Sequence, residues 1–114
     1  GLGAGFTGEA YEKVGAVLLN EIEEIYERSE MVIKVKEPLP PEYSLLREGL
    51  VLFTYLHLAP NRELTDRLLE SKVTGIAYET VEKKGRLPLL IPMSEVAGRM
   101  SAQEGAKYLE REFG

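Results

Sequence analysis

Apolar and polar positions form short blocks along the chain, and the least interrupted apolar block is residues 50–58, Leu-Val-Leu-Phe-Thr-Tyr-Leu-His-Leu. No acidic or basic side chain breaks this block, which has about the length of one strand. Continuous runs of this kind are typical of parallel strands that helices cover on both faces. We therefore expect a strand at 50–58, with His57, the only histidine of the chain, near its end.

Similar blocks to either side predict the rest of the secondary structure. Thr7, Asn20 and Ser94 are suitable helix N-caps, and Gly15 and Gly49 are suitable C-caps. Pro60 and Asn61 open a further helix. The expected helices are 8–14, 21–29, 40–48, 61–71 and 94–112. The expected strands are 16–19, 31–35, 50–58 and 73–79, with a turn at 83–85 and a short apolar return at 87–91. Strands that alternate with helices imply right-handed parallel βαβ units, so the predicted fold is α/β with an open, mainly parallel sheet flanked by helices.

Composition narrows the class of protein. At 114 residues the chain is one domain or part of one. The net charge of −5, from 14 basic and 19 acidic residues, disfavours nucleic acid or an anionic membrane as a partner. The chain has no cysteine, and its longest apolar run is too short to span a bilayer. Without a secretion signal we expect a cytoplasmic protein, and a start at Gly1 suggests a processed product or a piece of something longer.

The first five residues, Gly-Leu-Gly-Ala-Gly, invite comparison with a dinucleotide-binding fingerprint. That fingerprint needs a preceding strand and a third glycine one place later, where Phe6 stands. Neither condition is met, so we expect a flexible loop here.

Three of the expected parallel strands end in polar residues: Lys36, His57 and Glu79. Neighbouring strands lie roughly 5 Å apart, so side chains at their carboxyl ends can share a cleft. There Lys36 could polarise a carbonyl oxygen and His57 could move a proton, which suits a small anionic carbonyl compound. The structural alternative for His57 is a buried core histidine that is hydrogen-bonded to a backbone carbonyl. The alternative for Lys36 and Glu79 is a solvated strand end, with Lys34 equally solvated beside Lys36.

The expected last helix adds a hydroxyl at its start. Ser94 and the first backbone amides could bind a phosphate or carboxylate, or Ser94 could be an N-cap only. Small residues crowd this helix and predict a tight helix–helix contact, within the protein or across a subunit interface. They are Ala97, Gly98, Ser101, Ala102, Gly105 and Ala106.

Four ordered motifs between positions 34 and 99 resemble the alanine dehydrogenase family. They are Lys34-Val35-Lys36-Glu37-Pro38, Phe53-Thr54-Tyr55-Leu56-His57-Leu58-Ala59, Ile76-Ala77-Tyr78-Glu79-Thr80 and Pro92-Met93-Ser94-Glu95-Val96-Ala97-Gly98-Arg99. The substrate domain of that family is similar to the N-terminal part of nicotinamide nucleotide transhydrogenase. Transhydrogenases lack the histidine, so His57 favours the dehydrogenase.

The resemblance implies an oxidoreductase that interconverts L-alanine with pyruvate and ammonia, using NAD, and that works as a cytoplasmic hexamer. It implies that Lys36 binds the substrate, that His57 is the acid/base catalyst and that Ser94 contacts the cofactor. It assigns no catalytic role to the position of Glu79.

The resemblance also implies that much of the enzyme lies outside this sequence. Residues 1–93 would be a truncated substrate domain of flavodoxin- or Rossmann-like fold, and 94–114 the start of the helix that leads to an NAD-binding domain. The isolated chain is then expected to be inactive. The chain could instead be a piece of a transhydrogenase-like NAD(H)-binding subunit, or an interaction module without catalysis.

Overall fold

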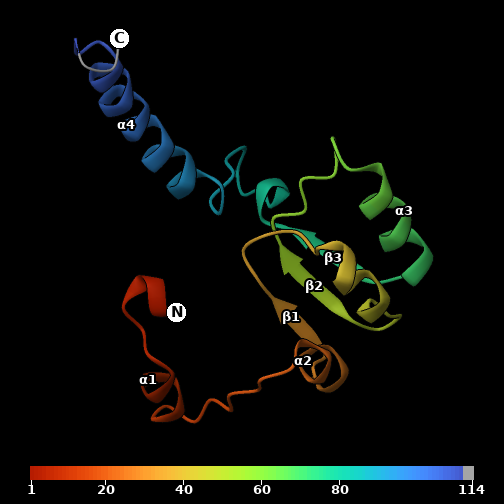
Figure 1. Ribbon diagram of the computed structural model, residues 1–114. Helices are drawn as coiled ribbons and strands as arrows, with labels where there is room; N and C mark the ends of the chain where they lie inside the picture. Colours follow the sequence, from red (N-terminus) through yellow and green to blue (C-terminus); the bar gives the residue numbers. More distant parts are fainter. Residues whose placement is uncertain (112–114) are drawn as a thin grey trace.

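A sheet of three parallel strands lies at the centre of the fold (Figure 1). The computed structural model describes residues 1–111. Strand β2 (Val51–Thr54) lies between β1 (Met31–Ile33) and β3 (Thr74–Ala77). Leu52 is in register with Val32 on one side and Gly75 on the other. The predicted parallel α/β sheet is confirmed, although each strand is shorter than its apolar block.

Short helices connect the strands. Helix α2 (Ile22–Arg28) precedes β1, the 3-10 helix η2 (Pro40–Leu45) links β1 to β2, and α3 (Arg62–Ser71) links β2 to β3. The helix predicted to open at Pro60 and Asn61 is confirmed, and the Asn61 side chain caps it by accepting a hydrogen bond from the backbone N–H of Leu64 at 3.0 Å. The predicted cap of α2 is wrong: Glu21, not Asn20, holds the N-cap position, and its side chain makes no capping bond.

The core lies on one face of the sheet, where α2 and α3 both contact η2. Its buried side chains are Tyr26, Val32, Leu46, Leu50, Leu52 and Leu56. Burying one such side chain contributes about 2 kcal/mol to folding. On α2 only Tyr26 is buried, whereas Ile22 and Ile25, which the helical spacing places on the same stripe, are exposed.

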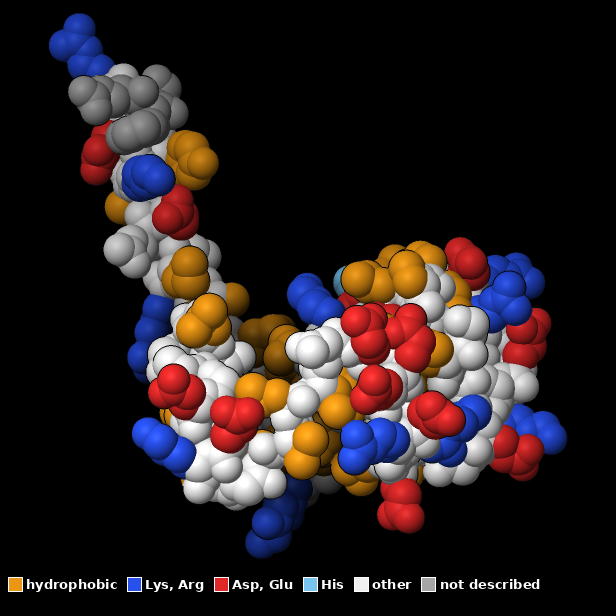
Figure 2. Space-filling view, turned by 60° about the horizontal axis from the view of Figure 1, so that its bottom comes forward, with side chains coloured by type: hydrophobic (Ala, Val, Ile, Leu, Met, Phe, Trp, Pro, Cys, Tyr) orange, Lys and Arg blue, Asp and Glu red, His pale blue; other side chains and the backbone are white. Residues whose placement is uncertain are grey.

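The opposite face of the sheet is partly open. Met31 is 46% exposed and Ile33 is 64% exposed, so the expectation that helices cover both faces is wrong for residues 1–111. Phe53 is half-buried on this face, with its ring centroid 4.5 Å from that of Tyr78. Figure 2 shows further hydrophobic side chains on the molecular surface. The apolar block around β2 therefore does not mean burial on both sides.

The N-terminal segment differs from its prediction. Residues Leu2–Ala4 form a 3-10 turn, η1, and α1 (Gly8–Glu12) follows, with the predicted Thr7 cap accepting from the N–H of Ala10 at 3.2 Å. The strand expected at 16–19 is wrong. Val17 and Leu18 are exposed there, because this segment runs apart from the sheet (Figure 1) and has no neighbouring strand within residues 1–111 to pair with.

The C-terminal part forms an arm that projects from the sheet (Figure 1). The predicted turn is confirmed, with positive φ at Lys84 and Gly85 between the paired residues Lys83 and Arg86. The apolar return at 87–91 is wrong, because this segment turns directly into α4 (Ile91–Tyr108). The expected end of this helix near Glu112 lies outside the described residues. Its small residues are exposed in the described chain, and a contact with another subunit stays a prediction.

Candidate functional site

A cavity of about 340 Å³ lies beyond the carboxyl ends of the strands. Lys36, His57 and Glu79, the three residues that follow different strands in the sequence, all line it. The remaining lining residues are Val35, Glu37, Tyr55, Leu90 and Met93. The fold thus brings together an ammonium, an imidazole and a carboxylate from positions far apart in the chain.

The backbone of Lys36 is fixed by the end of β2. The hydroxyl of Thr54, a fully buried residue, donates a hydrogen bond to the carbonyl oxygen of Lys36 at 2.8 Å. The N–H of Tyr55 donates to the carbonyl oxygen of Val35 at 3.2 Å. The Lys36 side chain itself is exposed, so its charge is open to a ligand in the cavity.

A buried carboxylate holds both ends of the segment that carries Lys36. Glu42 on η2, 5% exposed, forms an ion pair with Lys34 and accepts the backbone N–H of Leu39 at 2.7 Å. It also accepts a hydrogen bond from the Tyr26 hydroxyl at 3.0 Å. The alternative in which Lys34 and Lys36 are equally solvated is therefore wrong, because Lys34 forms an ion pair with the buried Glu42.

The electrostatics of this cluster favour an ionised Glu42. Burial alone would raise its pKa, but the hydrogen bonds from Leu39, Lys34 and Tyr26 and the positive charge of Lys34 outweigh that penalty, so the pKa of Glu42 lies below its usual value. The pKa of the Tyr26 hydroxyl is raised by burial, by the negative charge of Glu42 and by the hydrogen bond it donates to that carboxylate. Tyr26 therefore stays a neutral donor.

His57 lies beyond the strand rather than within it. Residue 57 is exposed, so the alternative of a buried core histidine is wrong. Its backbone has a φ of 46°, in the left-handed region that non-glycine residues seldom occupy. The Glu79 carboxylate accepts the backbone N–H of His57 at 2.7 Å and that of Leu56 at 3.1 Å.

Aromatic residues that the sequence analysis did not single out complete the wall. Tyr55 lines the cavity two residues before His57, and its hydroxyl donates to the carbonyl oxygen of Leu89 at 3.0 Å. Its ring lies edge-on to Tyr78, with centroids 4.9 Å apart. The available signal was the position of Tyr55 in the same apolar block, two residues before His57.

The structure gives Ser94 a different position from the expected one. Helix α4 begins at Ile91, so Ser94 lies in its first turns and is not the N-cap. Its backbone N–H is already bonded to the carbonyl oxygen of Leu90 at 3.1 Å. A phosphate site on free amides at this position is therefore wrong. What Ser94 offers is an exposed residue with a hydroxyl, next to the cavity-lining Met93.

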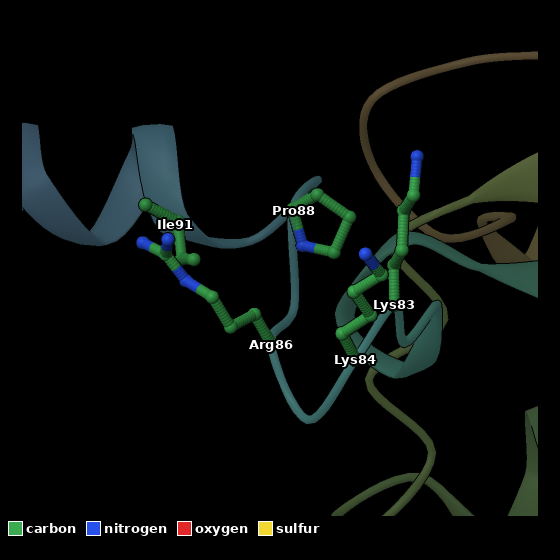
Figure 3. A pocket seen from close by; sticks show the side chains of 5 residues that line it. All are labelled: Lys83, Lys84, Arg86, Pro88 and Ile91. Carbon is green, nitrogen blue, oxygen red and sulfur yellow. The ribbon is translucent and has the colours of Figure 1, made fainter.

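A second hollow of about 400 Å³ lies beside the turn at 83–86. Its lining residues are Lys83, Lys84, Arg86, Pro88 and Ile91. Figure 3 shows the Arg86 side chain extending toward Ile91, with Pro88 between that pair and the two lysines. Its lining side chains are lysine, arginine and apolar residues, without an imidazole, a carboxylate or a hydroxyl, so this hollow is a poorer candidate for chemistry than the cavity at His57.

Two further classes of site find no support within residues 1–111. No cluster of three or more histidine, cysteine or acidic residues in that range could hold a metal ion. No helix in the same part of the chain has the length and apolar character needed to cross a membrane.

Known proteins similar to this chain show which family it belongs to. The family model described as "Alanine dehydrogenase/PNT, N-terminal domain" matches residues 1–97. The alanine dehydrogenase of Bacillus subtilis is 58% identical over 114 residues, and that of Methanococcus maripaludis is 57% identical over 115 residues. Both alignments cover all of this chain, which spans only 30% and 31% of the two relatives.

A solved structure gives the same result for the fold. A chain titled L-alanine dehydrogenase superposes with a TM-score of 0.90 at 52% sequence identity. The match covers 99% of this chain and 31% of that chain. The described chain therefore has the fold of the corresponding part of that L-alanine dehydrogenase chain.

Proposed function

Because this chain belongs to the alanine dehydrogenase/PNT N-terminal domain family, we propose that it is the substrate-binding part of an NAD-dependent alanine dehydrogenase. The observation that carries the proposal is the cavity that brings Lys36 and His57 together. The reaction would be the reversible conversion of L-alanine to pyruvate and ammonia. An interaction module would not need a cationic and a titratable group at one cavity. His57 favours the dehydrogenase over a transhydrogenase-like piece, because transhydrogenases lack the histidine.

Lys36 would bind the keto acid and polarise its carbonyl oxygen. In the direction of alanine synthesis, ammonia adds to the carbonyl carbon and the former carbonyl oxygen leaves as water, which requires proton transfer at that oxygen. His57 would move that proton, since an imidazole can both donate and accept near neutral pH. The carbon–nitrogen double bond that remains is then reduced to the amine.

NAD, when bound, supplies the hydride chemistry. Among the described residues, Ser94 fits one contact with such a cofactor, because its hydroxyl belongs to an exposed residue beside the cavity wall. Its bonded backbone N–H does not fit a phosphate clamp. We therefore assign Ser94 a single hydroxyl contact.

The finer properties of the enzyme rest on the same family membership. We place residues 1–93 in the substrate domain and propose that residues 94–114 lead on to an NAD-binding domain. Within the described residues, α4 spans Ile91–Tyr108. We further propose a cytoplasmic homo-hexamer acting on L-alanine and pyruvate, without a nucleic-acid or membrane partner.

The test uses the complete product of the gene that encodes this sequence. We expect it to oxidise NADH only when pyruvate and ammonia are both present. His57→Ala should lower turnover by about 10²-fold or more, the usual contribution of general acid/base catalysis. Glu82→Ala, a change in a nearby segment at a residue that lines no part of the cavity, is the matched control and should behave like wild type.

Two results would contradict the proposal. A wild-type protein without pyruvate-dependent NADH oxidation would exclude the reaction. A His57→Ala variant that keeps most of its turnover would exclude the assigned role of the imidazole.

A further inference from the structure

Glu79 faces the cavity, but its carboxylate is engaged with the backbone rather than with a charged side chain. One of its oxygens accepts the N–H of His57 at 2.7 Å and the N–H of Leu56 at 3.1 Å, and the other oxygen lies 3.4 Å from the N–H of Leu56. These contacts span 22 and 23 residues of sequence. They tie the segment after β3 to the segment after β2.

The backbone at His57 needs such a tie. A φ of 46° places this residue in the left-handed region, where glycine is the usual occupant and other side chains are strained. In a turn, successive backbone N–H groups can converge into a concave site that binds an anion. Here the two N–H groups of Leu56 and His57 converge in this way, and the Glu79 carboxylate fills the site they form.

We propose that Glu79 is the positioning residue of His57. Its carboxylate holds the strained turn of residues 56–57 and so fixes where the imidazole stands in the cavity. The inference rests on the proposed function for its kinetic consequence, but the backbone contact itself does not depend on any reaction. Glu79 acts through His57 and exchanges no proton with the substrate.

The same contacts argue against two other roles. A substrate carboxylate cannot use the N–H groups of Leu56 and His57, because Glu79 already occupies them. A general acid or base needs a carboxyl oxygen free to face the reacting atoms, whereas both oxygens of Glu79 already accept hydrogen bonds from backbone N–H groups.

Two conservative variants separate positioning from proton transfer. Glu79→Gln keeps the length of the side chain and an amide oxygen that can accept both N–H groups, but it cannot exchange a proton. Glu79→Asp keeps the carboxylate but is one methylene shorter, so it cannot reach both groups without movement. Positioning therefore predicts that Gln is better than Asp, whereas a role in proton transfer predicts the reverse order.

In the complete gene product we expect Glu79→Gln to lose about tenfold or less in kcat, because neutral hydrogen bonds replace charge-assisted ones. Glu79→Asp and Glu79→Ala should lose about 10²-fold, as a misplaced catalytic group does. KM for pyruvate should change little, since Lys36 is held separately by Thr54. The pH profile of kcat/KM should keep its shape in Glu79→Gln.

Amide hydrogen exchange supplies a readout that needs no activity. Exchange at Leu56 and His57 should be about tenfold faster in Glu79→Asp than in wild type, and close to wild type in Glu79→Gln. An Asp variant more active than the Gln variant, or unchanged exchange at both amides, would overturn the proposal. A wild-type protein that lacks the reaction but shows the exchange pattern would refute the proposed function and leave the positioning contact standing.

Discussion

At the scale of single residues, the two proposed functional groups are held by different means. Lys36 has its carbonyl oxygen fixed by the buried Thr54 hydroxyl, and His57 has its N–H fixed by the Glu79 carboxylate. Both anchors act on backbone atoms, so each leaves the functional side chain free to face the cavity. The sequence alone could place Lys36 and His57 at strand ends, but it contains no local signal for either anchor, because the partners are 18 and 22 residues apart.

Thr54→Val tests the anchor of Lys36. The variant removes the hydroxyl and leaves the Lys36 carbonyl oxygen without its donor, so we expect the free energy of unfolding to fall by about 1–2 kcal/mol. KM for pyruvate should rise several-fold in the complete gene product, while kcat changes less. The control is Thr65→Val, which removes a hydroxyl bonded to the carbonyl oxygen of Asn61 on α3, away from the cavity. Equal KM values in the two variants would contradict the anchoring role.

At the scale of elements, a segment forms the structure that its pattern predicts when the residues that stabilise it are close in the sequence. Helix α3 follows its prediction because its cap, Asn61, and its buried Leu64 are local to it. The segment 16–19 has apolar residues but no neighbouring strand, so pattern alone was misleading. The start of α4 moved from Ser94 to Ile91 because proline fits the first turn of a helix and Pro92 occupies it there.

The cluster around Glu42 lets one element, η2, hold the segment that carries Lys36, because Glu42 contacts both Lys34 and Leu39. Because the pKa of Glu42 is lowered in the folded chain, the folded state binds fewer protons than the unfolded state near the usual value of 4.5. The carboxylate therefore stabilises the fold above that pH, and this contribution is lost as the pH falls through the lowered pKa.

Glu42→Gln tests this linkage. At neutral pH the variant should be less stable than wild type by about 2 kcal/mol, as expected for lost hydrogen bonds to a charged group. The difference should shrink as the pH is lowered into the acid range, because wild-type Glu42 is then protonated as well. Urea denaturation of both proteins from neutral to acid pH measures this difference in the free energy of unfolding. The control is Glu63→Gln, a change at an exposed residue. A stability difference that does not vary with pH would contradict the role of the ionised carboxylate.

At the scale of the whole molecule, the chain presents one wall of a site rather than an enclosed pocket. Lys36 and His57 are both exposed, the face of β1 that carries Met31 and Ile33 is open, and α4 extends away from the sheet (Figure 1). The chain spans about 31% of the relatives it matches. The sequence could indicate that Lys36, His57 and Glu79 line this wall, but not how open it is, because exposure depends on what covers each element.

The 114-residue chain by itself should therefore bind its substrate weakly. Exposed charge pairings contribute about 1 kcal/mol or less each, whereas a millimolar dissociation constant already requires roughly 4 kcal/mol. We expect pyruvate to bind no tighter than about millimolar and no measurable NADH oxidation. An NMR titration that follows the ring resonances of His57 measures the binding, with the complete gene product as the positive control. Saturation in the micromolar range would show that Lys36, His57 and the cavity around them already form a complete substrate site.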